Sequence, residues 1–186
     1  MVTKSETTEI LTQPKLLEIN QPSLKRWLKH FFYLPATKRY FNKQDQHAIA
    51  HAVAQAEQGH VGEIQVVIEG HIPANHAYHL NTRGRAEQLF AELGVWDTEY
   101  NSGVLLYLNL CERQVEIVID RGIKNATQQQ VWEGICIQII ELMKQQQHRQ
   151  AILRGVFEIG NVLSDFYQYD RPDAENELSN TPVIFD

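Results

Sequence analysis

The sequence GVWDTEYNSGVLLYLNLCERQVEIVIDRGIKN, residues 94–125, contains two apolar, β-rich runs at residues 103–110 and 114–119. The polar residues 111–113 separate these runs, and two such runs across a short polar break predict a β-hairpin. Because a hairpin folds back on itself, its first and last residues lie side by side. We therefore expect Asp97, before the hairpin, to lie near Asp120, after it.

The segments on either side of the hairpin predict one more strand and four helices. Residues 63–69 alternate as a strand, and apolar residues recur at helical spacing in segments 43–58, 81–93, 127–146 and 149–167. The first strand, the helix after it and the first hairpin strand form a right-handed parallel crossover. The predicted fold is therefore α/β, a three-layer α/β/α sandwich with a small mixed sheet.

The length of 186 residues favours one domain with extensions at both ends. Residues 1–22 are polar, contain two prolines and show no sustained periodicity, so we predict a mobile arm. Residues 23–41 form a basic-aromatic segment, and the α/β domain is predicted to span residues 42–168. The acidic, proline-containing tail at residues 169–186 is predicted to be disordered.

The basic-aromatic segment has its helical part from Leu24 to Leu34. Trp27 and Phe31 are four residues apart, and Lys25, Arg26 and Lys29 add positive charge. Such a helix can make peripheral contact with an anionic membrane surface. It can also pack its aromatic rings on the domain and leave its lysines in water, which is the arrangement we favour.

Composition excludes some classes of protein. The net charge of −6 argues against a general nucleic-acid binder, which usually shows a basic face. Two cysteines make no disulfide framework. No apolar run approaches the roughly 20 residues of a membrane-spanning helix, and the N-terminal residues lack the apolar core of a signal peptide. We expect a cytoplasmic protein, with membrane association through the basic-aromatic segment as the alternative.

Oxygen-bearing side chains are predicted to meet at one end of the sheet. Two parallel strands begin at the same end, where the antiparallel second strand of the hairpin finishes. This topology gathers five candidate metal ligands beside the cation Arg121: Glu63, Asp97, Glu99, Asn101 and Asp120. Carboxylate and amide oxygens suit calcium or magnesium, and Arg121 could anchor an anion. The alternative is that these residues are loop caps and solvated charges.

Histidines form a competing set. His71, His76 and His79 follow the first strand, and His47 and His51 are spaced to share one helix face. A zinc site needs a further ligand and oriented partners, which the sequence does not place, so we expect surface histidines, with adventitious nickel or zinc binding as the alternative. The nucleophile and phosphate-binding motifs G-x-S-x-G, C-x-x-C and the Walker loop do not occur.

Several segments resemble the TPM-domain family in their order along the chain. They are Gly62-Glu63-Ile64, residues 85–90, residues 93–97, residues 101–105 and residues 115–118. The resemblance extends over residues 42–167. In detail, the sequence is similar to a bacterial branch of uncharacterised proteins, many of them named as membrane proteins. It implies an α/β/α sandwich and divalent-metal binding. It also implies an acid phosphatase activity, described for a plant member, with a site around Glu63, Asp97 and Asp120.

Three functional hypotheses follow. The first is a divalent-metal-binding domain that acts through an unidentified protein partner, in envelope or membrane-protein maintenance. The second is a weak metal-dependent acid phosphatase, for which Ser102 and Thr98 are the only evident hydroxyl nucleophiles. The third is a structural or oligomerisation domain without a metal site. We prefer binding to catalysis, because acidic groups repel phosphate unless a metal neutralises them.

Overall fold

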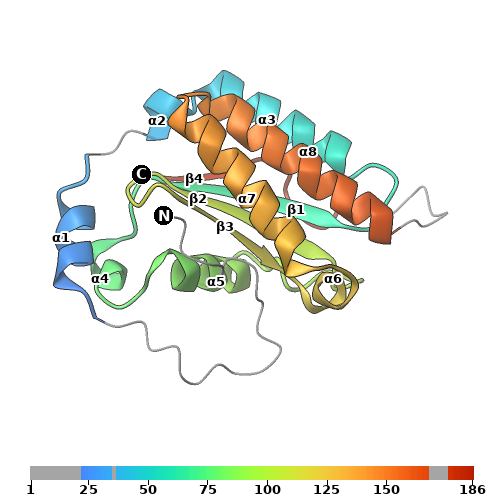
Figure 1. Cartoon of the computed structure of the whole chain (residues 1–186), viewed down its shortest axis with the longest axis horizontal. Coiled ribbons are helices and arrows are strands. Elements are labelled where there is room, and N and C mark those ends of the chain that lie inside the picture. The colour runs from blue at the N-terminus through green and yellow to red at the C-terminus, as the bar shows by residue number, and fades with distance from the viewer. Residues whose placement is uncertain (1–21, 35–36, 168–175) are drawn as a thin grey trace.

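The computed structural model describes residues 22–34, 37–167 and 176–186, so the predicted N-terminal arm lies almost wholly outside the described residues. Helices lie on both sides of one mixed sheet (Figure 1). The helices are α1 Leu24–Phe31, α2 Thr37–Tyr40, α3 Lys43–Ala56, α4 Ala74–Ala77, α5 Thr82–Glu92, α6 Arg121–Ala126, α7 Gln129–Lys144 and α8 His148–Phe166. The strands are β1 Glu63–Glu69, β2 Gly103–Asn109, β3 Gln114–Ile119 and β4 Val183–Phe185.

The sheet has the strand order β3-β2-β1-β4. Strand β1 runs parallel to β2, with Glu63 opposite Gly103, and β2 runs antiparallel to β3, with Val104 opposite Ile119. The predicted hairpin and parallel crossover are therefore confirmed. We name the end of the sheet where β1 and β2 begin the amino end, and the opposite end the carboxyl end.

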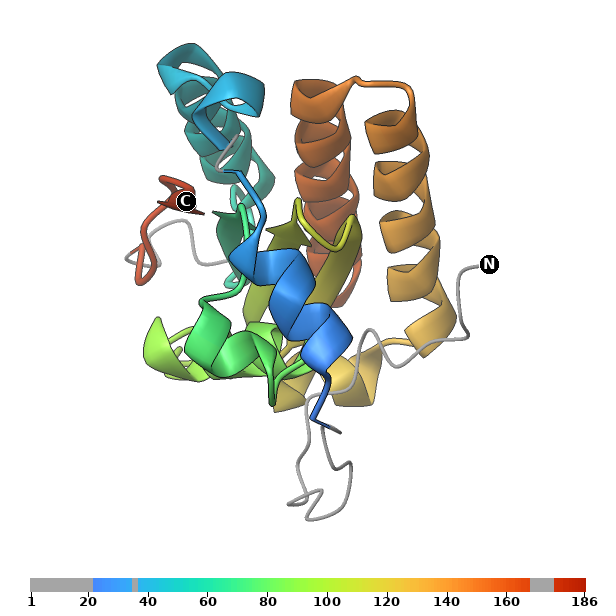
Figure 2. The same ribbon diagram turned by 90° about the vertical axis from the view of Figure 1, so that its left-hand side faces the viewer.

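Helices cover both faces of the sheet. Helices α3, α7 and α8 lie on one face and α5 lies on the other (Figures 1 and 2). The larger core fills the first interface and includes Trp132, Ile139 and Ile159, and the smaller core includes Leu89 and Tyr107. The three-layer α/β/α sandwich with a small mixed sheet is thus as predicted. None of the helices in the described segments is long and apolar enough to cross a membrane.

The C-terminal tail departs from the prediction. Val183–Phe185 form strand β4, which pairs parallel with β1. Thr37 adds a hydrogen bond from its hydroxyl to the Phe185 carbonyl, at 3.3 Å. The expectation of a disordered tail is therefore wrong for residues 176–186, because the last residues satisfy the otherwise open hydrogen-bonding edge of β1.

Helix α1 docks on the domain through its polar side. Arg26 donates from Nε to the Ala77 carbonyl at 2.7 Å, and the Ser23 amide donates to the Tyr78 carbonyl at 2.9 Å. Trp27 is half-buried and stacks on Phe31, whereas Phe31 and Phe32 are 57% and 71% exposed. The expectation that the aromatic rings pack inward is therefore wrong for Phe31 and Phe32, since backbone carbonyls of the domain select the polar side of α1.

Glu57 predicts a pH dependence of stability. Its Oε1 accepts the Ile64 amide at 2.8 Å, and burial raises the pKa of the Glu57 carboxyl from its ordinary 4.5 to about 8. Between these two values the folded protein holds a proton that the unfolded chain has released, so the free energy of unfolding falls as pH rises. Glu57→Gln removes this titration. We expect the melting temperature of Glu57→Gln, relative to wild type, to rise between pH 5 and pH 8 in paired thermal melts. An offset that is equal at the two pH values would contradict this account.

Candidate cation site at the amino end of the sheet

The predicted site residues Glu63 and Asp120 lie at the same end of the sheet. Glu63 begins β1 opposite Gly103, and the Asp120 amide donates to the Gly103 carbonyl at 2.9 Å. Both acids are buried, with 6% of each residue exposed. Glu63 Oε2 accepts the Leu178 amide at 3.3 Å, and burial raises the pKa of the Glu63 carboxyl. The topology thus brings Glu63 and Asp120 to one end of the sheet, as expected.

The other predicted acids do not converge with them. Asp97 and Glu99 are exposed, and Asn101 is exposed in the turn that precedes β2. Within the described residues, no three acids of the predicted set bring their ligand atoms within 4.8 Å of one another. Instead the Glu99 amide donates to both carboxylate oxygens of Glu177, at 3.1 Å each, and Glu177 belongs to the tail that was predicted to be disordered. The predicted cluster of four carboxylates is therefore distributed along this end of the sheet.

Among the predicted site residues, Asp120 has a carboxylate oxygen that is buried and unpaired. It caps α6, and its Oδ1 accepts the Arg121 amide. Its Oδ2 is buried and has no hydrogen-bond partner among the described residues. Burial raises the pKa of the Asp120 carboxyl, against the opposing effects of the Arg121 amide and charge. An unpaired, buried carboxylate oxygen is costly, so a proton or a cation at Oδ2 would stabilise this arrangement.

Further oxygen atoms surround Gly122, two residues after Asp120. A Cβ built on Gly122 would lie 2.6 Å from the Asn101 carbonyl oxygen, 2.8 Å from the Tyr167 hydroxyl and 3.2 Å from the Tyr100 carbonyl oxygen. Only glycine allows these oxygen atoms to approach the backbone so closely. A cavity of about 280 Å³ is lined by Tyr100, Asn101, Arg121 and Gly122. The donors available here are oxygen atoms, which fit calcium or magnesium and do not fit a soft metal.

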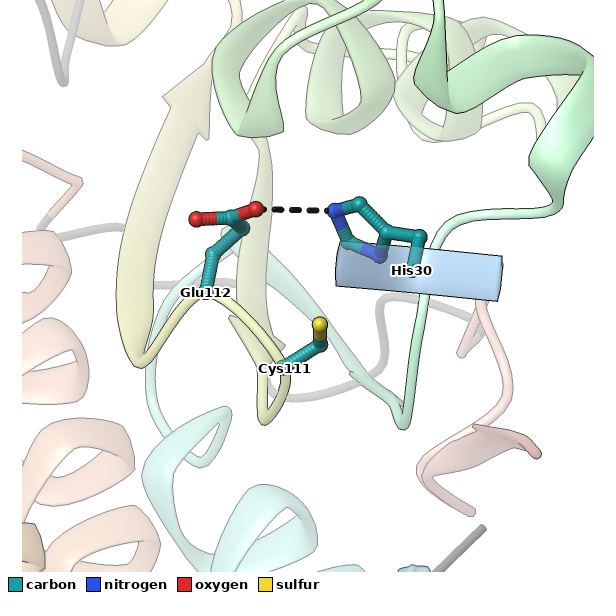
Figure 3. Close-up of side chains that lie close together, drawn as sticks. All are labelled: His30, Cys111 and Glu112. Atoms are coloured by element: carbon teal, nitrogen blue, oxygen red, sulfur yellow. Dashed lines mark ion pairs between the residues drawn. The ribbon is translucent and has the colours of Figure 1, made fainter. Parts of the chain in front are cut away.

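A second group of titratable side chains, which the sequence did not predict, lies at the carboxyl end of the sheet. His30 of α1 meets Cys111 and Glu112 of the β2–β3 turn, with Nε2 of His30 lying 3.0 Å from Oε1 of Glu112 (Figure 3). Lys29 also contacts Glu112, at 2.7 Å. No local pattern could have revealed this group, because more than eighty residues separate His30 from Glu112 and the fold alone joins them.

Hydrogen bonding makes this group structural. Nδ1 of His30 accepts the Ile72 amide at 3.0 Å, so the neutral ring carries its proton on Nε2, facing Glu112. The side-chain hydrogen bond from His30 is the main reason that the pKa of Glu112 falls to about 2. Burial raises the pKa of the Cys111 thiol to about 11. A metal on Nε2 would leave no proton for either nitrogen, and the thiol is not ionised at neutral pH. We conclude that this group holds α1 on the hairpin.

The five histidines that were predicted to lie at the surface occupy exposed or partly buried positions. His47, His51 and His79 are exposed, and His71 and His76 are partly buried in the segment after β1. Within the described residues, none of the five joins two other His, Cys, Asp or Glu side chains at metal-ligand separation. The two cysteines are free, as the absence of a disulfide framework predicted.

Together these features define a small α/β sandwich with an oxygen-lined position at the amino end of its sheet. The chain belongs to the TPM domain family, whose profile matches residues 36–162. The resemblance that the sequence segments indicated is thereby confirmed. No curated protein matches the chain.

Solved structures share the fold of this chain. The chain is similar to the BA42 protein from the psychrophilic bacterium Bizionia argentinensis, with 25% identity, a TM-score of 0.67, and coverage of 82% of this chain and 95% of that one. It is also similar in fold to the N-terminal domain of a protein from P. gingivalis, with 16% identity, a TM-score of 0.58, and coverage of 70% of this chain and 82% of that domain.

Proposed function

We propose that this TPM domain binds a hard divalent cation, calcium or magnesium, at the amino end of its sheet and acts through a protein partner. Asp120 supplies the buried carboxylate ligand, and the carbonyl oxygens of Tyr100 and Asn101 lie against Gly122, two residues further along the chain. Asp97, Glu99 and Glu63 supply further negative potential. The observation that carries the proposal is the buried Oδ2 of Asp120, which has no hydrogen-bond partner among the described residues.

Binding is preferred to catalysis because both hydroxyl nucleophile candidates are already engaged. Ser102 is buried and donates its hydroxyl to the Val61 carbonyl at 2.6 Å. Thr98 is also buried, and its hydroxyl oxygen accepts the Ser102 amide at 2.9 Å. Neither hydroxyl is presented to a substrate, and both stabilise the turn that leads into β2.

A weak metal-dependent acid phosphatase is the second candidate function. One observation favours it: exposed Arg121, which follows Asp120 in the sequence, lines the small cavity. A cation bound by Asp120 would neutralise local charge and could activate a water, while Arg121 would anchor a phosphate. The readout is hydrolysis of a phosphate monoester that depends on the divalent cation and is lost in Asp120→Asn and Arg121→Gln.

Cation binding is tested by thermal melts with millimolar calcium or magnesium. A ligand that binds only the folded state must raise the melting temperature. We expect wild type to be stabilised, and the stabilisation to weaken as the pH falls into the acidic range, because burial raises the pKa of Asp120 and protons then compete with the cation. Asp120→Asn should abolish the cation effect and melt slightly higher without cation, because it removes a buried charge.

Matched variants distinguish the loss of a cation ligand from the loss of a negative charge elsewhere on the surface. Asp97→Asn should weaken the cation effect if this exposed acid bends inward to the ion. Glu141→Gln removes the same charge from an exposed position on α7 and should respond as wild type does. The proposal is wrong if neither cation raises the melting temperature of wild type, or if Asp120→Asn responds as strongly as Glu141→Gln.

A further inference from the structure

A cavity of about 1100 Å³ lies at the carboxyl end of the sheet, away from Asp120. Its lining residues come from α1 and the residues after it, from α2, from the β2–β3 hairpin, and from the end of α7 with the start of α8. This volume is at the upper limit of pockets that bind small molecules. In open α/β sheets, ligands bind outside the carboxyl ends of the parallel strands. Both size and position therefore suit a ligand site.

The floor of the cavity is apolar. Strands β2 and β3 contribute Leu108 and Val115, the turn contributes Leu110, and α7 contributes Ile140 and Met143. These side chains carry only aliphatic or thioether groups, so they favour a flexible hydrocarbon over a polar ligand. The floor continues the larger core of the domain, to which all five residues belong or against which they pack.

Aromatic side chains form a wall of the cavity. Tyr40 lies against His148 with ring centroids 4.5 Å apart, and both rings line the cavity. Tyr33 also lines it, and burial raises the pKa of the Tyr33 hydroxyl. These rings add apolar surface between the aliphatic floor and the solvent.

Cations surround this apolar floor. Arg39, Arg113 and Lys144 line the cavity and are exposed, and the described residues offer none of the three an ion-pair partner. Lys29 also lines the cavity but is paired with Glu112. No acidic side chain is among the lining residues in the described ranges, although the chain carries a net charge of −6. The local potential therefore favours an anion.

Backbone conformation gives an independent indication. Arg113 has φ of 57° and Gln146 has φ of 62°, a left-handed conformation that non-glycine residues adopt rarely. Both residues line the cavity. Glycine would adopt this conformation without strain, whereas a residue with a Cβ costs on the order of 1 kcal/mol or more. The strained backbone of Arg113, at the edge of the cavity, indicates that its side chain has a function there.

We propose that this cavity binds an anionic amphiphile: a single phosphate or carboxylate head joined to an aliphatic body. Arg39, Arg113 and Lys144 hold the head, and the floor around Ile140 and Met143 receives the body. The site is separate from the proposed cation site, because it lies at the opposite end of the sheet and uses none of its residues.

The test is calorimetric titration of the full chain with monomeric decyl phosphate. Wild type should bind it, and should bind inorganic phosphate or uncharged decyl maltoside much more weakly. Arg113→Gly should lose roughly tenfold in affinity, the usual effect of removing one charge-assisted contact. Its melting temperature should equal or exceed that of wild type, because glycine relieves the strain. Loss of binding can therefore not be attributed to unfolding.

Two further arms complete the test. Arg39→Gln should weaken binding in the same way, whereas Lys43→Gln, at an exposed position of α3 outside the cavity, should bind as wild type does. Flotation with vesicles containing phosphatidic acid distinguishes a bilayer headgroup from a free amphiphile. The proposal is overturned if decyl maltoside binds equally well, if inorganic phosphate binds equally well, or if Arg113→Gly and Arg39→Gln retain full affinity.

Discussion

Replacing Gly103 by alanine should destabilise the protein by roughly 3 kcal/mol or more, which is the upper range for overpacking a folded interior. A Cβ built on Gly103 would lie 1.9 Å from the carbonyl oxygen of Val95. A backbone oxygen cannot rotate away as a side chain can, so the loop before β2 or the strand itself must move. The expected fall in melting temperature is roughly 6 °C or more for a chain of this size.

Gly134 provides a matched control of opposite sign. It lies within α7, and nothing lies within 4 Å of a Cβ built on it. Gly134→Ala should therefore stabilise the helix by up to about 1 kcal/mol. Suppose that Gly103→Ala has the melting temperature of wild type while Gly134→Ala has a higher one. The close approach of residues 95 and 103 then does not exist in solution.

The buried ion pair between Glu69 and Arg85 is the second feature whose loss should have a large effect. Arg85 donates to Glu69 Oε1 from Nη2 at 2.7 Å and from Nε at 3.1 Å, and the Tyr107 hydroxyl donates to Oε2 at 2.6 Å. The Arg85 side chain is 7% exposed and the Glu69 side chain is 1% exposed. Glu69→Ala leaves a buried guanidinium without its carboxylate and should cost about 3–5 kcal/mol in urea unfolding.

The double variant Glu69→Leu with Arg85→Met distinguishes an orphaned charge from lost packing. Replacing both charges by apolar groups of similar size should recover most of the stability. Arg154 on α8, paired with Glu158 on the same exposed face, gives the surface comparison, and Arg154→Ala should cost less than about 1 kcal/mol. A double variant as unstable as Glu69→Ala would contradict this explanation.

Local patterns in the sequence predict most of the fold. The hairpin follows from two apolar runs across residues 111–113, and the crossover rule sets β1 parallel to β2. Strand β4 escaped prediction because it has three residues, all only partly buried, and its pairing with β1 spans more than a hundred positions. The orientation of α1 was not predicted, because its apolar residues outnumber the polar residues that contact the domain.

The candidate site could be predicted only in part. Strand topology places Glu63 and Asp120 at one end of the sheet, and that part needs no side-chain detail. Whether Asp97 and Glu99 turn inward depends on the turn before β2, where Asn101 adopts φ of 51°. Loop conformation of this kind is set by tertiary hydrogen bonds, such as those of Thr98 and Ser102, which sequence spacing does not reveal.

The central claim is that Asp120 and its neighbours bind calcium or magnesium. Its most direct test is a calcium titration followed by ¹H–¹⁵N correlation spectra of the full chain. We predict saturable shifts concentrated in the amides of residues 98–103 and 119–123, present in Glu141→Gln and absent in Asp120→Asn. Spectra that do not change at these amides in millimolar calcium, or that change identically in Asp120→Asn, would contradict it.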